Sequence, residues 1–139
     1  MLKDAMGGYR GTAKEICRII AEHPDNAEAY YDLGNARSSC EDYDGAIDAF
    51  TMALKIGLRF REAITAYGNR GIARVKSGDF KGAIQDFTEI IERKPNNKRL
   101  LCSAYKSRAL VKEKIGDSEG EERDNKMALL LSPDDGNNQ

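Results

Sequence analysis

The chain has 139 residues, among them 22 basic residues, 23 acidic residues and one histidine. This length fits a single domain with a useful core. The nearly balanced charge gives no general reason to expect nucleic acid as a partner. No apolar run approaches the roughly 20 residues that span a membrane, so no membrane partner is expected either.

Residues 1–4 lack the apolar core of a secretion signal. The cysteines, Cys17, Cys40 and Cys102, are odd in number and widely spaced, which fits a reducing compartment. The sequence therefore predicts a cytoplasmic protein, although a chain from which a signal had been trimmed would look the same.

Apolar periodicity and turn residues predict an all-α fold of seven helices. In chain order these are 11–22, 27–40, 44–56, 61–77, 80–93, 98–115 and 118–131. Asn26 and Asn97 are expected as caps or turns, and Ser118 with Glu121 is expected to form a capping box. Residues 1–8 are expected to fray, and 134–139 to form a disordered tail with nothing to bury.

One pattern of residues occurs three times, over 27–58, 64–95 and 102–133. The first copy carries Tyr30, Leu33, Gly34, Tyr43, Ala46, Phe50 and Ala53; the second carries Tyr67, Arg70, Gly71, Phe80, Ala83, Phe87, Ile90 and Pro95; the third carries Tyr105, Arg108, Ala109, Gly116, Asp117, Ala128 and Pro133. A leading half-copy carries Ala13, Cys17, Ile20 and Pro24. The succession of aromatic residue, small residue, loop, alanine, phenylalanine and proline resembles the tetratricopeptide repeat.

This resemblance implies a right-handed α-solenoid of helical hairpins. The expected units are one domain over 9–133, divided into a half repeat 9–26 and repeats 27–60, 64–97 and 102–133. The small residues Gly34, Gly71 and Ala109 are expected where two helices of a hairpin approach closely. Their spacings of 37 and 38 residues exceed the family's usual 34 or so, which predicts first helices lengthened by about one turn.

The two ends of the array are expected to differ. Polar Glu121 and Asn125 stand where earlier copies have alanine and phenylalanine, which predicts a C-terminal cap with a polar outer face. The apolar residues of 128–131 are expected to dock inward. On the leading helix, Cys17 is expected in the core, and an apolar strip formed by Ile16, Ile19 and Ile20 is expected to stay partly uncovered and to favour a homodimer.

No catalytic or cofactor-binding constellation was found, and the sequence predicts neither an enzyme nor a metal site. His23 is the only histidine, and its place next to Pro24 favours a role at a helix C-terminus. Asp42 and Asp44 supply too few oxygen ligands for a calcium loop. There is no glycine-rich phosphate-binding loop.

The resemblance implies that function lies in the groove formed by the first helices, where this family holds extended peptides. The candidate groove residues are Tyr31, Asn35, Asn69, Ile72, Lys76, Lys106, Leu110 and Lys114. The apolar members would seat side chains, whereas the asparagines and lysines would bind backbone groups or a carboxylate. The opposing interpretation is that these are ordinary exposed helix positions.

One subgroup of the family clamps the C-terminal carboxylate of heat-shock chaperones with two asparagines and several basic residues. Asn35 and Asn69 match that clamp, but Tyr31, Ser103 and Ser107 stand in place of its basic residues.

The sequence thus favours a non-catalytic scaffold that binds an extended peptide or a partner helix. The alternatives are a self-assembling structural subunit that dimerises through its leading helix, a co-chaperone with an incomplete carboxylate clamp, and a regulatory subunit of an enzyme complex.

Overall fold

The computed structural model describes residues 10–132, which form seven α-helices. They are α1 Arg10–Glu22, α2 Ala27–Ser39, α3 Tyr43–Ile56, α4 Phe60–Ser77, α5 Phe80–Glu92, α6 Lys98–Lys114 and α7 Ser118–Leu131. Each boundary lies within one residue of the sequence-based prediction. The predictions for 1–8, Pro133 and 134–139 fall outside the described residues.

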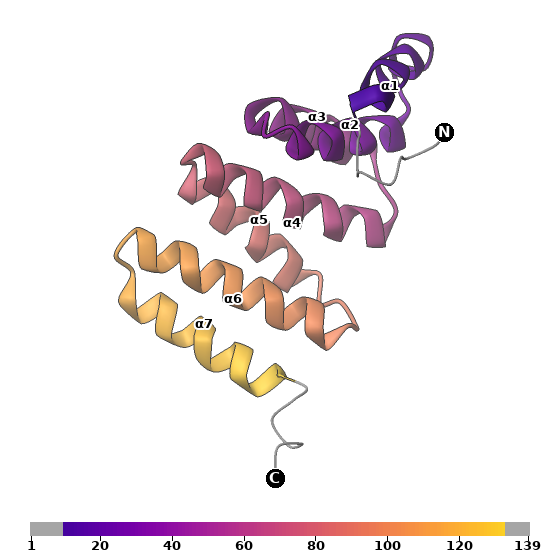
Figure 1. The fold of residues 1–139 in the computed structure, drawn as a ribbon. Helices are drawn as coiled ribbons and strands as arrows, with labels where there is room; N and C mark the ends of the chain where they lie inside the picture. Colours follow the sequence, from indigo (N-terminus) through magenta and orange to yellow (C-terminus); the bar gives the residue numbers. More distant parts are fainter. Residues whose placement is uncertain (1–9, 133–139) are drawn as a thin grey trace.

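The helices stack in chain order, with α1 at one end of the molecule and α7 at the other (Figure 1). We call α2–α3 hairpin 1, α4–α5 hairpin 2 and α6–α7 hairpin 3. The second helix of each hairpin packs against the first helix of the next. The fold is therefore an all-α solenoid, as predicted. Within the described ranges, no helix is both long and apolar enough to cross a bilayer.

Aspartates begin the second helix of every hairpin. The side chains of Asp42, Asp79 and Asp117 accept hydrogen bonds from the backbone N–H three residues later, at 3.0, 2.9 and 2.9 Å. Such N-caps satisfy donors that have no partner inside the helix. The expected capping box at Ser118 was therefore wrong, because Asp117 caps α7 and Ser118 lies inside its first turn. The predicted caps at Asn26 and Asn97 are confirmed.

The two helices of hairpins 1 and 2 meet at a glycine and a phenylalanine. A Cβ atom at Gly34 would lie 2.6 Å from the Phe50 ring, and one at Gly71 would lie 2.8 Å from the Phe87 ring. Any side chain there would push the helices apart. This confirms that the small residues mark close approaches.

The first helices of hairpins 2 and 3 are longer than that of hairpin 1, as the repeat spacing predicted. Helix α2 has 13 residues, whereas α4 has 18 and α6 has 17. The added turns lie at the N-terminal ends of α4 and α6.

The leading helix packs differently from the prediction. Ile16 is 0% exposed and packs with Ala29, Leu33 and Ala49, whereas Cys17 is exposed. Ile16 lies eight residues before a proline, as Phe87 does, so the correct register is one residue earlier than predicted. Ile19 and Ile20 also pack on this cluster and are half-buried, so the expected apolar strip is reduced to their exposed parts.

Helix α7 corrects a second expectation. Ala128 is buried, but Leu129 and Leu130 are 65% and 78% exposed, so they do not dock inward. Successive helical residues point about 100° apart, so the inward direction of Ala128 turns Leu129 and Leu130 away from the contact with α6. Asn125 is exposed, in agreement with the predicted polar face.

Candidate functional site

The predicted groove residues lie on the first helices α2, α4 and α6. Ile72 and Leu110 are more than half exposed, and the three lysines of the set are exposed. Tyr31 is half-buried, because its ring packs edge-to-face on Phe50 with the ring centroids 6.1 Å apart. Tyr31 thus belongs mainly to the wall of the core, whereas the others present their side chains to solvent.

Asn35 and Asn69 are brought together, although 34 residues separate them. Asn69 Nδ2 donates a hydrogen bond to Asn35 Oδ1 at 3.1 Å, and both side chains are half-buried. This bond holds the two amide planes. It leaves Asn35 Nδ2 to donate and Asn69 Oδ1 to accept, which is the complement of a peptide C=O and N–H.

A narrow hollow of about 190 Å³ lies between α4 and α6, and we call it the α4–α6 groove. Asn69 and Ile72 line it from α4, and Ser103 and Ser107 line it from α6. Gly68 and Ile90 also line it, and a Cβ atom at Gly68 would lie 3.6 Å from Ile90 Cδ1, in ordinary contact. Of the predicted groove residues, only Asn69 and Ile72 line this hollow.

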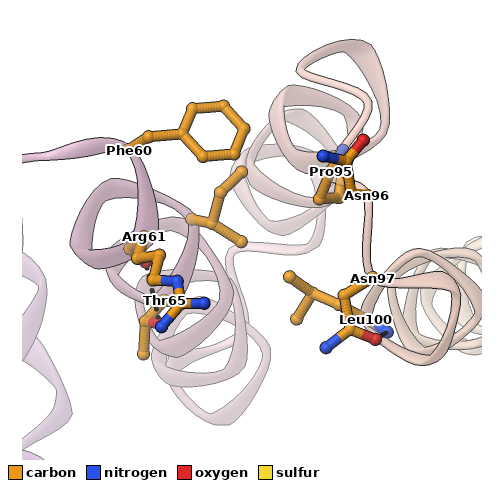
Figure 2. A pocket seen from close by; sticks show the side chains of 8 residues that line it. Phe60, Arg61, Thr65, Pro95, Asn96, Asn97 and Leu100 are labelled. Carbon is orange, nitrogen blue, oxygen red and sulfur yellow. Dashed lines mark hydrogen bonds between the residues drawn. The ribbon is translucent and has the colours of Figure 1, made fainter.

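A wider hollow of about 710 Å³ adjoins it at the N-terminal ends of α4 and α6, and we call it the end hollow. It is lined by Phe60, Arg61, Ile64, Thr65, Pro95, Asn96, Asn97 and Leu100. Figure 2 shows Phe60, Arg61 and Thr65 on one side and Pro95, Asn96, Asn97 and Leu100 on the other. The two hollows share Ile64, Thr65 and Leu100, so they form one continuous surface.

Sequence reasoning missed the end hollow. The available signal was the excess of three or four residues in the spacing between copies. Those residues were correctly assigned to lengthened helices. The packing of α4 against α6 decides which side chains of the added turns are exposed, and the sequence does not give that packing.

A different environment surrounds two buried aspartates. Arg70 donates to Asp86 at 3.0 Å from Nε and 2.6 Å from Nη2, and Arg74 adds a bond of 3.0 Å. In hairpin 3, Arg108 donates to Asp124 at 2.8 and 2.7 Å. Both carboxylates are almost fully buried, so these ion pairs hold the hairpins together.

The electrostatics of Asp124 follow from this geometry. Burial opposes ionisation of the carboxyl, but hydrogen bonds from Arg108 and Lys112 outweigh that penalty and lower the pKa of Asp124 below its ordinary value. The bond to Asp124 also raises the pKa of Arg108.

Reactive side chains do not assemble into a catalytic group in the part of the chain that the structure describes. His23, Cys17 and Cys40 are exposed, and the buried Cys102 donates its thiol to the Ala128 carbonyl at 3.3 Å. No group of three or more histidine, cysteine or acidic residues within 10–132 is placed to hold a metal ion.

Comparison with solved structures points to one fold. A crystal structure of MamA superposes with a TM-score of 0.74 at 27% identity, over 86% of this chain and 66% of that one. The UNC-45 chaperone, described as binding and folding muscle myosin, superposes with a TM-score of 0.65 at 35% identity, over 78% of this chain and 12% of that one.

Sequence relatives are much longer proteins. Serine/threonine-protein phosphatase 5 of Rattus norvegicus is 26% identical over 106 residues, which are 76% of this chain and 21% of that protein. The UDP-N-acetylglucosamine–peptide N-acetylglucosaminyltransferase of Giardia intestinalis is 29% identical over 80 residues, or 58% of this chain and 5% of that protein. The chain thus spans only a small part of these relatives.

The family model for the tetratricopeptide repeat matches residues 27–56 and 64–97. These segments contain hairpin 1 and nearly all of hairpin 2, including both contacts between glycine and phenylalanine. The sequence pattern, the stacked hairpins and the structural neighbours all agree, and the chain is a tetratricopeptide repeat protein.

Proposed function

We propose that this chain is a non-catalytic protein-interaction module that binds an extended segment of a partner protein across the first helices of its hairpins. Domains of this family generally bind other proteins. The observation that carries the finer proposal is the hydrogen bond between Asn35 and Asn69.

An extended peptide carries backbone groups that have no partner of their own. The free donor of Asn35 and the free acceptor of Asn69 are held side by side by their mutual bond, so a peptide unit gains two hydrogen bonds without ordering either side chain anew. Each such bond that is lost in a half-buried site costs about 1–3 kcal/mol. The α4–α6 groove continues from Asn69 and provides room for the segment beyond it.

The experiment is a selection of peptides from a random display library on the parent chain. Each selected peptide is then measured against the double variant Asn35→Ala with Asn69→Ala. We expect binding to weaken at least about tenfold, because two backbone contacts are lost. Melting is expected to stay near that of the parent, since one hydrogen bond between two half-buried amides contributes only about 1 kcal/mol.

Asn125→Ala is the matched control, because Asn125 is an exposed asparagine on α7 and lies outside the groove. It should leave peptide binding unchanged. Peptides that bind the double variant as tightly as the parent would place the site elsewhere on the solenoid.

Self-assembly through the leading helix has a smaller structural basis than expected, because Ile16 is fully buried by hairpin 1 and Ile19 and Ile20 are partly buried. We therefore do not favour the dimer as the main function.

A further inference from the structure

The end hollow exists because α4 and α6 begin before the family pattern does. The family model matches from residue 64, whereas α4 begins at Phe60. Helix α6 likewise begins at Lys98, four residues before the corresponding start of the third copy. The added turns contribute Phe60 and Arg61 from one helix and Leu100 from the other. This hollow is thus a feature of this chain's own spacing.

Its lining suits a large apolar side chain. Phe60 is 52% exposed at one edge, although a ring of this size is normally covered. Ile64 and Pro95 are buried and Leu100 is half-buried, so the apolar part of the lining is fixed by the core beneath it. The hollow thus has an apolar part that can hold a side chain, beside the polar residues Arg61, Thr65, Asn96 and Asn97, which can orient the ligand.

The charge around the hollow is strongly one-sided. Helix α4 carries four basic residues and one acidic residue, and α6 carries six and one. Arg70, Arg74, Arg108 and Lys112 pair with the two buried aspartates. The other basic residues of these helices form no ion pair within the described part of the chain; they are Arg61, Lys76, Lys98, Arg99, Lys106 and Lys114.

This separation of paired and unpaired cations is informative. The four cations that serve the fold share two buried aspartates. The six other cations of α4 and α6 outnumber the acidic residues of these helices, Glu62 and Glu113, so a partner that brings carboxylates would find unpaired positive charge there. By contrast, α2 carries Glu28 and Asp32 and only one basic residue, Arg37. Among the first helices of the hairpins, the excess of basic residues is therefore found on α4 and α6.

We propose that the end hollow anchors a bulky apolar side chain of an acidic partner segment, and that the segment continues along the α4–α6 groove. This inference rests on the proposed function and specifies its ligand. The apolar side chain would fill the space between Phe60 and Leu100, and neighbouring carboxylates would meet Arg61 and the unpaired cations of α6.

The test is an amide NMR titration of the whole chain with synthetic peptides. The first probe is a nonapeptide of glutamate, serine and glycine with a central phenylalanine. We expect saturable shifts concentrated at residues 60–65 and 96–100. A companion peptide with central alanine, and another with lysine in place of glutamate, should each bind about tenfold more weakly.

Two variants test the pocket itself. Phe60→Ala and Arg61→Glu should each weaken the phenylalanine peptide about tenfold, and both residues are exposed, so the fold should persist. The matched controls are Leu130→Ala, an exposed apolar residue on α7, and Lys81→Glu, an exposed cation on α5 that does not line the hollow. They should change binding less than about twofold.

The remaining outcomes are each decisive. Binding that depends on Asn35 and Asn69 but ignores Phe60→Ala would overturn the anchoring pocket and leave the groove in place. Shifts that fall elsewhere, or no saturable shift at millimolar peptide, would overturn the acidic ligand class. A single-stranded oligothymidylate that moves the same amides at lower concentration would identify a nucleic-acid site and reject this proposal.

Discussion

Hairpins 1 and 2 differ in the residues that fill the contact between their two helices, which are apolar in hairpin 1 and charged in hairpin 2. A crease between the two helices of each hairpin is lined at equivalent positions, 37 residues apart. In hairpin 1 the crease holds Leu33 and Ala49, which pack on Ile16 of α1. In hairpin 2 the same positions are Arg70 and Asp86, which form a buried ion pair.

The helix that precedes each hairpin presents a residue that matches the polarity of the crease. Arg70 also donates to the hydroxyl of Thr51 on α3 at 3.1 Å, and Arg108 donates to Thr88 on α5 at 3.0 Å. The equivalent position on α1 is Cys17, which faces the apolar Leu33. The central pair of each crease is therefore either apolar, as in hairpin 1, or an ion pair, as in hairpin 2. This teaches that the backbone tolerates both solutions, provided that a buried charge at this position has a partner of opposite charge.

Hairpin 3 shares the charged crease of hairpin 2 but lacks its core phenylalanine. It keeps the charged crease, with Arg108 and Asp124, but has Asn125 where the other hairpins have a phenylalanine.

The largest expected effect on stability comes from removing the phenylalanine that hairpin 3 lacks. Phe87→Ala should lower the free energy of unfolding by about 3–5 kcal/mol, because Gly71 offers no side chain to fill the cavity.

Urea denaturation measures this loss directly. Asn125→Ala is the comparison at the equivalent position, and it should cost less than about 0.5 kcal/mol because the residue is exposed. Equal losses for the two variants would mean that α7 is not a solvent-facing cap.

The next largest effect on stability comes from removing one partner of the buried ion pair in hairpin 2. Arg70→Leu leaves Asp86 buried with a single bond from Arg74, and should cost about 3 kcal/mol. The double change Arg70→Leu with Asp86→Ala gives hairpin 2 the crease of hairpin 1, and should come within about 1 kcal/mol of the parent. A double variant as unstable as the single one would show that the two creases are not interchangeable.

Sequence reasoning found the helices and hairpins because both depend on local signals. Turn glycines, caps and the repeated small residues are readable without tertiary contacts, and every helix boundary was close. The predicted register of α1 was wrong because Cys17 and Ile16 are adjacent and both apolar, and only the packing of α1 on α2 and α3 decides which of them is buried. The buried aspartates were missed because a charged residue on a helix is normally solvated.

The candidate site also has features that the repeat register predicts and features that depend on tertiary packing. Asn69 and Ile72 line the α4–α6 groove, and the sequence could assign them to that face because the face follows from the register of the repeat. The bond between Asn35 and Asn69 and the end hollow depend on the offset between neighbouring hairpins. A repeat pattern fixes which face a residue occupies, but it leaves the distance between helices open.

A smaller effect concerns acid. The pKa of Asp124 is lower in the folded chain than the ordinary carboxyl value of about 3.9. Its ion pairs therefore contribute their full stability above that pH, and the contribution is lost as the pH falls through the folded pKa. Urea midpoints measured from neutral pH down to about pH 3 should fall less steeply for Arg108→Leu with Asp124→Ala. Parallel curves would show that Asp124 does not couple folding to protons.

The smallest expected effect lies in the turns. Glu41 adopts a left-handed backbone with φ of 61°, at the position where hairpins 2 and 3 have Gly78 and Gly116, with φ of 91° and 84°. A residue with a side chain pays about 1–2 kcal/mol for this conformation. Glycine removes that strain but adds about 0.5–1 kcal/mol of conformational freedom to the unfolded chain. Glu41→Gly should thus raise stability by about 0.5 kcal/mol in urea denaturation, whereas Gly78→Glu should lower it by a similar amount. A gain in stability for Glu41→Gly and a loss for Gly78→Glu would show that the two turns have the same backbone requirement, so that residues can be exchanged between them as is expected for the creases. A loss on Glu41→Gly would instead mean that the Glu41 side chain itself stabilises the first turn.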